Sequence, residues 1–179
     1  MKPELVAQEK RHLADMLEAI QRCVYFLDAA SASLEWPLKL EALVQDKKNT
    51  ALFNTLATIN ERFAKLQDTL GAAMRHSMGL LSEPAETFLK VLAFYEKVGV
   101  IDSIADWQTI RFVRNLAAHS YETDYAAIAE HFNTLHDMQP TLYQSSGRFL
   151  MYCRDTIGIE PASVDFVHEF AAITGRPPK

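Results

Sequence analysis

One short segment of the chain gathers residue types that can act on a phosphodiester. It holds Arg114, Asn115, His119 and Tyr121 within eight residues. Arginine is a permanent cation whose planar fork of donors fits phosphate, and histidine can take or give a proton near neutral pH. Such a pair could cleave RNA without a metal, because the histidine would move protons while the arginine stabilises the charge that builds on phosphorus.

The spacing of these residues decides which of them can share a helical face. Arg111, Arg114 and Asn115 stand at i, i+3 and i+4, so they form one polar, basic face. Arg114 and His119 are five positions apart, which is about 140° around an ideal helix. An unbroken helix would therefore separate them. We expect the helix to end near Ala118, so that His119 enters the following loop and returns over the last turn.

At these residues the chain resembles the HEPN-domain ribonuclease toxins of the HepT type. Their signature is Arg-Asn-x3-His-x-Tyr followed by an acidic residue, and here it reads Arg114, Asn115, His119, Tyr121, Glu122. The resemblance extends over about residues 52–142. It implies that Arg114 and His119 are the catalytic pair of a metal-independent endoribonuclease and that Asn115 supports them. Arg111, if it faces the same cleft, would hold the RNA backbone without reading its bases.

The resemblance also implies a fold and partners. Its members are antiparallel all-α bundles that form homodimers, which brings two copies of the motif to one cleft. Each pairs with a small MntA-type nucleotidyltransferase antitoxin, which neutralises the toxin by adding AMP to the motif tyrosine, here Tyr121. We therefore expect the toxin of a type VII-like toxin–antitoxin pair, acting on RNA with no metal and no cofactor.

Two other interpretations of the motif stay open. At a generic helix end, Arg114 would be a surface residue favoured by the helix dipole, His119 a capping residue and Tyr121 a core aromatic. Alternatively, the chain is a non-catalytic helical subunit that binds a nucleotidyltransferase. Arg114 and Tyr121 would then position a nucleotide or the partner's active site, and His119→Ala would leave growth unchanged.

Composition favours one all-α domain over residues 1–179. The chain is 49% hydrophobic and 23% charged, and glycine and proline are scarce, at 6 and 7 residues, which favours helix over sheet. No apolar run is long enough to cross a membrane. The N-terminus lacks a hydrophobic signal core, so we expect a cytoplasmic protein. Cys23 and Cys153 lack metal-ligand spacing and are expected to be buried.

The charge balance is a weak guide to the substrate. A net charge of −5 does not indicate a nucleic-acid-binding surface. The local distribution decides the field at a cleft, however. The segment 107–121 contains two arginines, one histidine and no carboxylate, and a two-fold dimer would double this basic patch.

Apolar residues at helical period predict the order of the elements. Asn49, Ser82, Ser103 with Asp106, and Asp124 are expected at helix starts, and Gly99 at a helix end. The ends of the chain add an N-terminal helix, a C-terminal helix and a flexible tail at 175–179 to the HEPN-like part. The expected helical ranges are about 3–33, 37–45, 50–78, 84–98, 104–118, from 125 past a bend or break at Pro140, and 161–174.

The other polar clusters are weaker candidates. The five-residue spacing of His131 and His136-Asp137 does not place two imidazoles on one helical face, so we expect no metal site there. Residues 144–148 could bind an anion, but no strand precedes them, and a helix or turn is expected. Lys47, Lys48, Arg62, Lys65 and Arg75 are expected to form solvated basic surface.

Three further residues carry structural expectations. Trp36 and Trp107 are expected in the core, although an exposed tryptophan can mark an interface. Gly71 interrupts a long helix, where it either allows a neighbouring element to pack closely or marks a weak point.

Overall fold

The chain is all-α throughout residues 3–116 and 123–176, the parts that the computed structural model describes. These residues form seven α-helices and one short π-helical turn, without any β-strand, which confirms the all-α part of the predicted fold class. The helices are α1 Pro3–Ala32, α2 Leu40–Gln45, α3 Thr50–Leu80, α4 Phe88–Lys97, α5 Ile104–Leu116, α6 Tyr125–Tyr152, the π-turn η1 Cys153–Ile157, and α7 Val167–Thr174.

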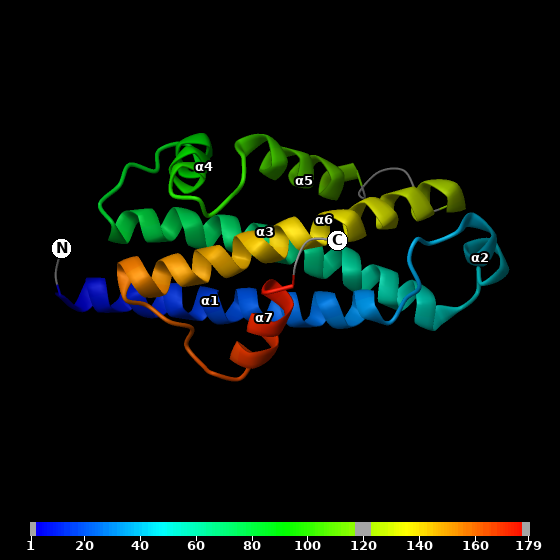
Figure 1. The fold of residues 1–179 in the computed structure, drawn as a ribbon, viewed down its shortest axis with the longest axis horizontal. Coiled ribbons are helices and arrows are strands. Elements are labelled where there is room, and N and C mark those ends of the chain that lie inside the picture. The colour runs from blue at the N-terminus through cyan, green and yellow to red at the C-terminus, as the bar shows by residue number, and fades with distance from the viewer. Residues whose placement is uncertain (1–2, 117–122, 177–179) are drawn as a thin grey trace.

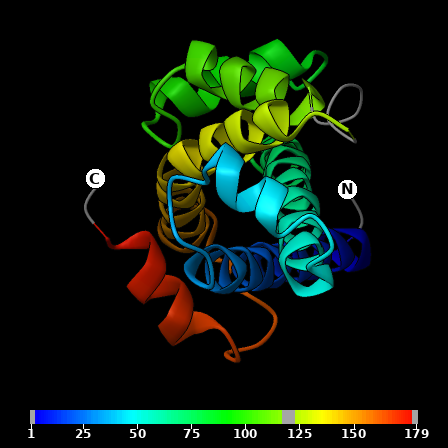
Figure 2. The ribbon, with the colours of Figure 1, turned by 90° about the vertical axis from the view of Figure 1, so that its right-hand side faces the viewer.

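Three long helices, α1, α3 and α6, form the body of the molecule (Figure 1). The helices α4 and α5 pack on α3, with α5 also against α6, while α7 packs on α1 and α6 (Figure 2). The chain runs in opposite directions along α1 and α3 but in the same direction along α3 and α6. The three long helices are therefore not uniformly antiparallel, because the α4–α5 segment carries the chain back before α6 begins.

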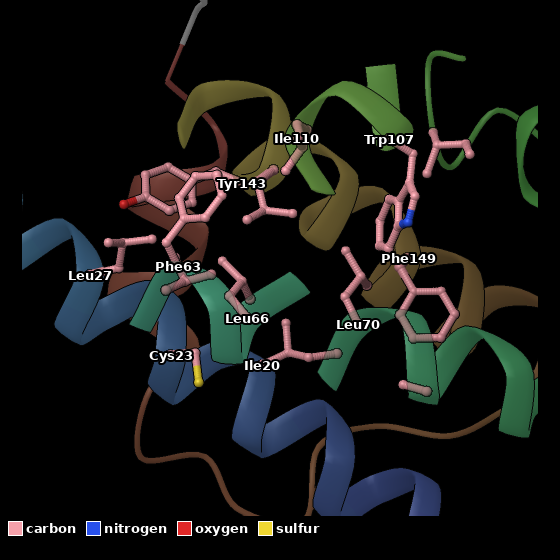
Figure 3. Packing of buried hydrophobic residues seen from close by; sticks show 14 of the residues in the cluster. Ile20, Cys23, Leu27, Phe63, Leu66, Leu70, Trp107, Ile110, Tyr143 and Phe149 are labelled. Atoms are coloured by element: carbon pink, nitrogen blue, oxygen red, sulfur yellow. The ribbon is translucent and has the colours of Figure 1, made fainter. Parts of the chain in front are cut away.

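Inward-facing apolar side chains of the three long helices form one continuous core (Figure 3). Burying each of them contributes about 1.5–3 kcal/mol of transfer free energy. The core extends to Tyr95 of α4, whose hydroxyl bonds the Ser77 hydroxyl at 2.6 Å. Fully buried members are Leu13, Leu17, Ile20, Val24, Leu27, Ile59, Phe63, Leu66, Leu70, Leu135, Leu142 and Phe149.

Both cysteines lie inside this core, as predicted. Burial raises the pKa of Cys153 to about 12. Burial also raises the pKa of Cys23, against an opposing effect of the neighbouring Arg62. Because the thiolate is the reactive form of cysteine, both residues serve as small apolar core side chains.

Most of the predicted helix boundaries are confirmed by capping contacts. The Asn49 side chain accepts from the backbone N–H of Leu52, and Asp124 accepts from two N–H groups in the first turn of α6. Ser103 Oγ accepts from the N–H of Asp106 and donates to the Asp106 carboxylate. Gly99 has a φ of 75°, which lets it end α4 without steric cost.

The prediction that Ser82 begins a helix near Pro84 is wrong. Ser82 belongs to the turn that ends α3, where its N–H donates to the Gly79 carbonyl and its φ is 59°. The next helix, α4, begins at Phe88, and the Thr87 hydroxyl caps it by accepting from the N–H of Lys90. Serine and threonine can both cap a helix through the side-chain oxygen, so residue type alone did not distinguish the two positions.

The C-terminal region also differs from the prediction. Of the two alternatives for Pro140, a bend or a break, the break is excluded, because α6 continues through Pro140 to Tyr152. The last helix begins at Val167 rather than near Pro161. The segment before it is not helical because its backbone bonds another element: the N–H of Ala162 donates to the Ala14 carbonyl in α1 at 3.1 Å. Of the expected tail, Arg176 is ion-paired with Asp28, and residues 177–179 lie outside the described part.

Among the helices of residues 3–116 and 123–176, none has both the length and the apolar character that a membrane-spanning helix needs.

Candidate functional site

The motif helix α5 is positioned by its apolar face. Trp107, Ile110 and Val113 are buried against the core, so this helix has an apolar side in addition to the polar face predicted for it. Arg111 lies on the exposed side and Arg114 is half-buried. Packing of α5 on α3 and α6 therefore fixes the direction in which both arginines point.

A hollow of about 370 Å³ lies beside α5, and we call it the arginine hollow. Residues of three helices line it. The side chains at the rim are polar, and the aromatic side chains lie at the base. The lining residues are Gln67, Asp68, Gly71, Ala72 and Arg75 from α3, Phe88 from α4, and Trp107, Arg111 and Arg114 from α5.

Arg114 is held by two oxygen acceptors. Its Nη1 donates to Asp68 Oδ1 across the hollow, and its Nε donates to Asn115 Oδ1 at 3.3 Å. The guanidinium side chain is 21% exposed and the Asp68 carboxylate 64% exposed, so this ion pair lies at the rim. Such a pair orients the arginine but contributes little stability.

The charge of the hollow is positive. Its wall contains three arginines, Arg75, Arg111 and Arg114, and one carboxylate, Asp68. Arg75 lies over the Phe88 ring at 5.8 Å from the ring centroid, a cation–π contact that steadies the side chain. A concave surface with an excess of guanidinium groups concentrates anions, and guanidinium donors match phosphate oxygens.

The base of the hollow is formed by close packing of α3 and α5. The Gln67 side chain donates from Nε2 to the Trp107 carbonyl at 3.3 Å, and its Oε1 is buried without a hydrogen-bond partner among the described residues. A Cβ atom at Gly71 would come within 3.1 Å of Phe88 Cζ and 3.3 Å of Trp107 Cζ2. Gly71 thus allows the close approach that was one of the two expectations for it.

The structure brings together only part of the predicted site. Arg111 and Arg114 line the hollow, and Asn115 is exposed and bonds Arg114 without lining the hollow itself. His119 and Tyr121, with the expected end of the helix near Ala118, lie outside the described residues. The described part of the site is therefore a concave cationic surface on α3, α4 and α5, and the motif continues beyond it in residues outside the described part.

Sequence reasoning missed the contribution of α3 to this site. Arg75 is exposed, as expected for a solvated basic surface, and it also lines the hollow together with Asp68, which was not predicted. Asp68, Gly71 and Arg75 stand at i, i+3 and i+7, which places them on one face of α3. The available signal was Gly71, which has residues of opposite charge, Asp68 and Arg75, at these spacings on either side.

The other histidine candidates have structural contacts. His131 Nε2 lies 3.3 Å from Asn60 Oδ1, and burial lowers the pKa of His131. His136 stacks on Trp36. Within residues 3–116 and 123–176, no three histidine, cysteine, aspartate or glutamate side chains are grouped so that they could hold a metal ion.

Two further predictions can be compared with the structure. Residues 144–148 lie inside α6, as expected for a helix or turn. Arg148 there donates to the Val100 carbonyl and pairs with Asp102 at 2.9 Å. Trp107 is in the core, but Trp36 is only half-buried, because it lies on the surface of α6 rather than between helices.

Comparison with protein-family models, with curated proteins and with solved structures gave no match to this chain. The functional inference therefore depends on the arginine hollow and on the motif that continues from α5.

Proposed function

We propose that the chain is a metal-independent endoribonuclease of the HEPN type and the toxin of a type VII-like toxin–antitoxin pair. The observation that carries this proposal is the arginine hollow. Arg111 and Arg114 of the motif helix and Arg75 of α3 line one surface, directly before the segment that contains His119. This arrangement supports binding of an RNA phosphate beside a proton-transferring histidine.

In the proposed mechanism, the RNA 2′-hydroxyl attacks the adjacent phosphorus. His119 takes the proton of the 2′-hydroxyl, and Arg114 stabilises the negative charge of the phosphorane. The bond from phosphorus to the 5′-oxygen then breaks, and that oxygen receives a proton from His119 of the partner subunit. The products are a 2′,3′-cyclic phosphate and a free 5′-hydroxyl. Arg75 and Arg111 hold the neighbouring phosphates without reading bases.

The proposal includes a homodimer in which two motifs face one cleft. Phe112, between the two faces of α5, is 64% exposed, and burial of this ring against a second copy supports such an interface. Phe112→Asp is expected to dissociate the dimer and to lower RNA cleavage with it. Light scattering after size-exclusion chromatography measures the first effect, and a cleavage assay at matched concentration measures the second.

Tyr121 is the proposed control point. Addition of AMP by a nucleotidyltransferase antitoxin would place an anion beside Arg114 and His119, filling the phosphate site and repelling RNA. Intact mass spectrometry after co-expression is expected to find AMP on wild type and none on Tyr121→Phe. A neutralised but unmodified wild type would contradict this control mechanism and indicate inhibition by binding alone.

The decisive experiment is inducible expression of wild type, Arg114→Ala and His119→Ala with total RNA examined for fragments. We expect growth arrest and RNA fragments in wild type only. Matched controls are Arg154→Ala and His168→Ala, which remove the same side chains from exposed positions outside the hollow. Both are expected to remain toxic.

The ends of the fragments test the mechanism separately. Cyclic phosphate and 5′-hydroxyl ends, produced equally with and without a chelator, are expected. Fragments with 5′-phosphate ends would reject the proposed attack by the 2′-hydroxyl. A harmless wild type with intact RNA would reject the nuclease and leave the non-catalytic, nucleotidyltransferase-binding subunit as the better description.

A further inference from the structure

A second and larger cavity, of about 650 Å³, lies away from the arginine hollow. It is enclosed by the C-terminal part of α1, the connection after it, the middle of α6 and the end of α7, and it shares no lining residue with the hollow. We call it the Trp36–His136 cavity. Its volume is in the range typical of small-molecule sites.

One wall of this cavity is a stacked aromatic pair, in which each ring covers one face of the other, so that only an outer face of the pair can take a further ring. The rings of Trp36 and His136 stack with centroids 4.2 Å apart and an interplanar angle of 7°. Ser31 fixes both rings: its carbonyl accepts from Trp36 Nε1 at 2.8 Å, and its hydroxyl is hydrogen-bonded to His136 Nδ1 at 3.0 Å. The wall is therefore held in place, which lowers the entropic cost of binding a ring against it.

The segment that carries Trp36 is itself fastened to α6. The Leu38 N–H donates to Asn133 Oδ1 at 2.7 Å, and Asn133 Nδ2 donates to the Leu38 carbonyl at 3.0 Å. This amide pair imitates one step of backbone pairing and leaves neither group unsatisfied. The aromatic wall thus belongs to the folded body.

A buried amide donor lines the same cavity. Gln139 is 3% exposed, and its Nε2 has no hydrogen-bond partner among the described residues. The other end of the amide is engaged, since Tyr143 donates its hydroxyl to Gln139 Oε1 at 3.4 Å. An unpaired buried donor is costly in a folded protein. Because Gln139 Nε2 is closed off from solvent, a ligand acceptor bonds it only when the Gln139 side chain turns toward the cavity.

The charged groups of the cavity do not favour phosphate. Asp28 and Asp137 are its carboxylates and Arg176 is its arginine, and Arg176 pairs with Asp28 at 2.7 Å. Burial, together with the negative charge of Asp28, raises the pKa of Tyr143, which keeps the phenol neutral. The lining therefore offers an aromatic face, an amide donor and a carboxylate acceptor without excess positive charge.

We propose that the Trp36–His136 cavity binds a single nucleobase, carried by a free nucleoside or by an unpaired residue of RNA. A nucleobase is planar and packs on aromatic rings. One of its edges combines an acceptor, suited to Gln139 Nε2, with an N–H donor, suited to the Asp28 carboxylate. This proposal does not depend on ribonuclease activity, because it rests on residues outside the arginine hollow.

The two tryptophans of the chain provide a site-resolved test. In Trp107→Phe, fluorescence reports only from Trp36; we expect saturable quenching by at least one of adenosine, guanosine, cytidine and uridine. Calorimetry on wild type should give the same dissociation constant, which guards against a folding defect in the reporter variant. Adding a 5′-phosphate to the nucleoside should not strengthen binding.

Two variants localise the binding. Gln139→Leu removes the buried donor and should weaken binding by about tenfold or more. Trp36→Ala removes half of the aromatic wall at a half-buried position and should weaken it by a similar factor. Arg111→Ala, in the arginine hollow, is the matched control and should bind nucleosides as wild type does. Circular dichroism confirms that each variant is folded.

The possible outcomes separate the two sources of the base. Quenching by nucleosides assigns the cavity to a small molecule. Quenching of Trp36 by a short single-stranded oligonucleotide but by no nucleoside assigns it to a base of RNA. If neither ligand binds, or if Gln139→Leu and Trp36→Ala both bind as tightly as wild type, the proposal is wrong, and the ribonuclease proposal is unaffected.

Discussion

The arginine hollow and the Trp36–His136 cavity are built on different helices around one core and have opposite chemistry. The hollow is lined by α3, α4 and α5, whereas the cavity is lined by α1 with the connection after it, α6 and α7. The hollow presents three arginines and one carboxylate, and the cavity presents one arginine and two carboxylates around an aromatic wall. The first is suited to the backbone of a nucleic acid and the second to a base. If both proposals hold, a helical bundle separates these two kinds of recognition by using the outward faces of different helices whose inner faces share one core.

The two sites also differ in how their polar groups are held. Arg111 is exposed and Arg114 is held at a rim by Asp68, whereas Gln139 is buried and fixed by Tyr143. Exposed charges act through the field and are screened by salt. Buried donors act through defined hydrogen bonds. Binding at the hollow should therefore depend on ionic strength, and binding at the cavity should not.

The largest effect is expected from filling the hollow. Gly71→Val would push methyl groups into Phe88 and Trp107, which already lie within 3.5 Å of an added Cβ. We expect a loss of about 1–3 kcal/mol in the free energy of unfolding and loss of RNA binding, with nucleoside binding at the cavity retained. Denaturant titration and the two binding assays measure these effects.

Gly79→Val is the control for this substitution. Gly79 lies in the same helix, and nothing lies within 4 Å of a Cβ added there. Its stability should change by less than about 0.5 kcal/mol. Equal destabilisation by both substitutions would mean that the loss of stability comes from placing valine in this helix, and that it does not come from the close approach of Phe88 and Trp107 to Gly71.

The next effect concerns salt. Arg111→Ala should weaken binding of single-stranded RNA by about tenfold at low salt and reduce the slope of log K against log salt by about 0.7. Arg154→Ala removes the same charge outside both sites and should do neither. Fluorescence anisotropy with a labelled oligonucleotide at several salt concentrations provides the measurement. An unchanged slope in Arg111→Ala would place the RNA elsewhere.

The smallest effect is expected from releasing Arg114. Asp68→Asn removes the carboxylate that holds this guanidinium and should strengthen RNA binding by about twofold to fivefold, because an exposed ion pair is worth little. Asp155→Asn removes an exposed carboxylate that is paired with Arg154 outside both sites and serves as the matched control. If both variants strengthen RNA binding equally, net charge rather than the Asp68–Arg114 pair is responsible.

Local features of the fold were predictable from the sequence. Asn49, Ser103 and Asp124 were identified as caps because short polar side chains bond the nearest free N–H groups. The placement of Trp107 in the core followed from helical period, which depends on neighbours within two turns. Ser82 was misassigned because the last turn of α3 uses its backbone, and that could not be read from residue type.

The candidate site likewise combines features that local spacing predicted with features that depend on residues far apart in the sequence. Arg111 and Arg114 were placed on one face by spacing, and the structure puts both in the hollow. Asp68 and Arg75 belong to another helix, so no local pattern joined them to the motif. Trp36 was expected in the core for its apolarity, but its position depends on His136, 100 residues further along the chain.

The sequence by itself determined that the chain is helical, where most helices begin, and that two arginines share a face with a histidine and a tyrosine close behind. These properties depend on contacts between residues within a few positions. Only the tertiary structure decided that Asp68 would meet Arg114, 46 positions away, that Ser31 would meet His136, 105 positions away, and that Asp28 would meet Arg176, 148 positions away. Such pairs depend on which helices pack together and in which direction, and that is fixed by burial of the whole core.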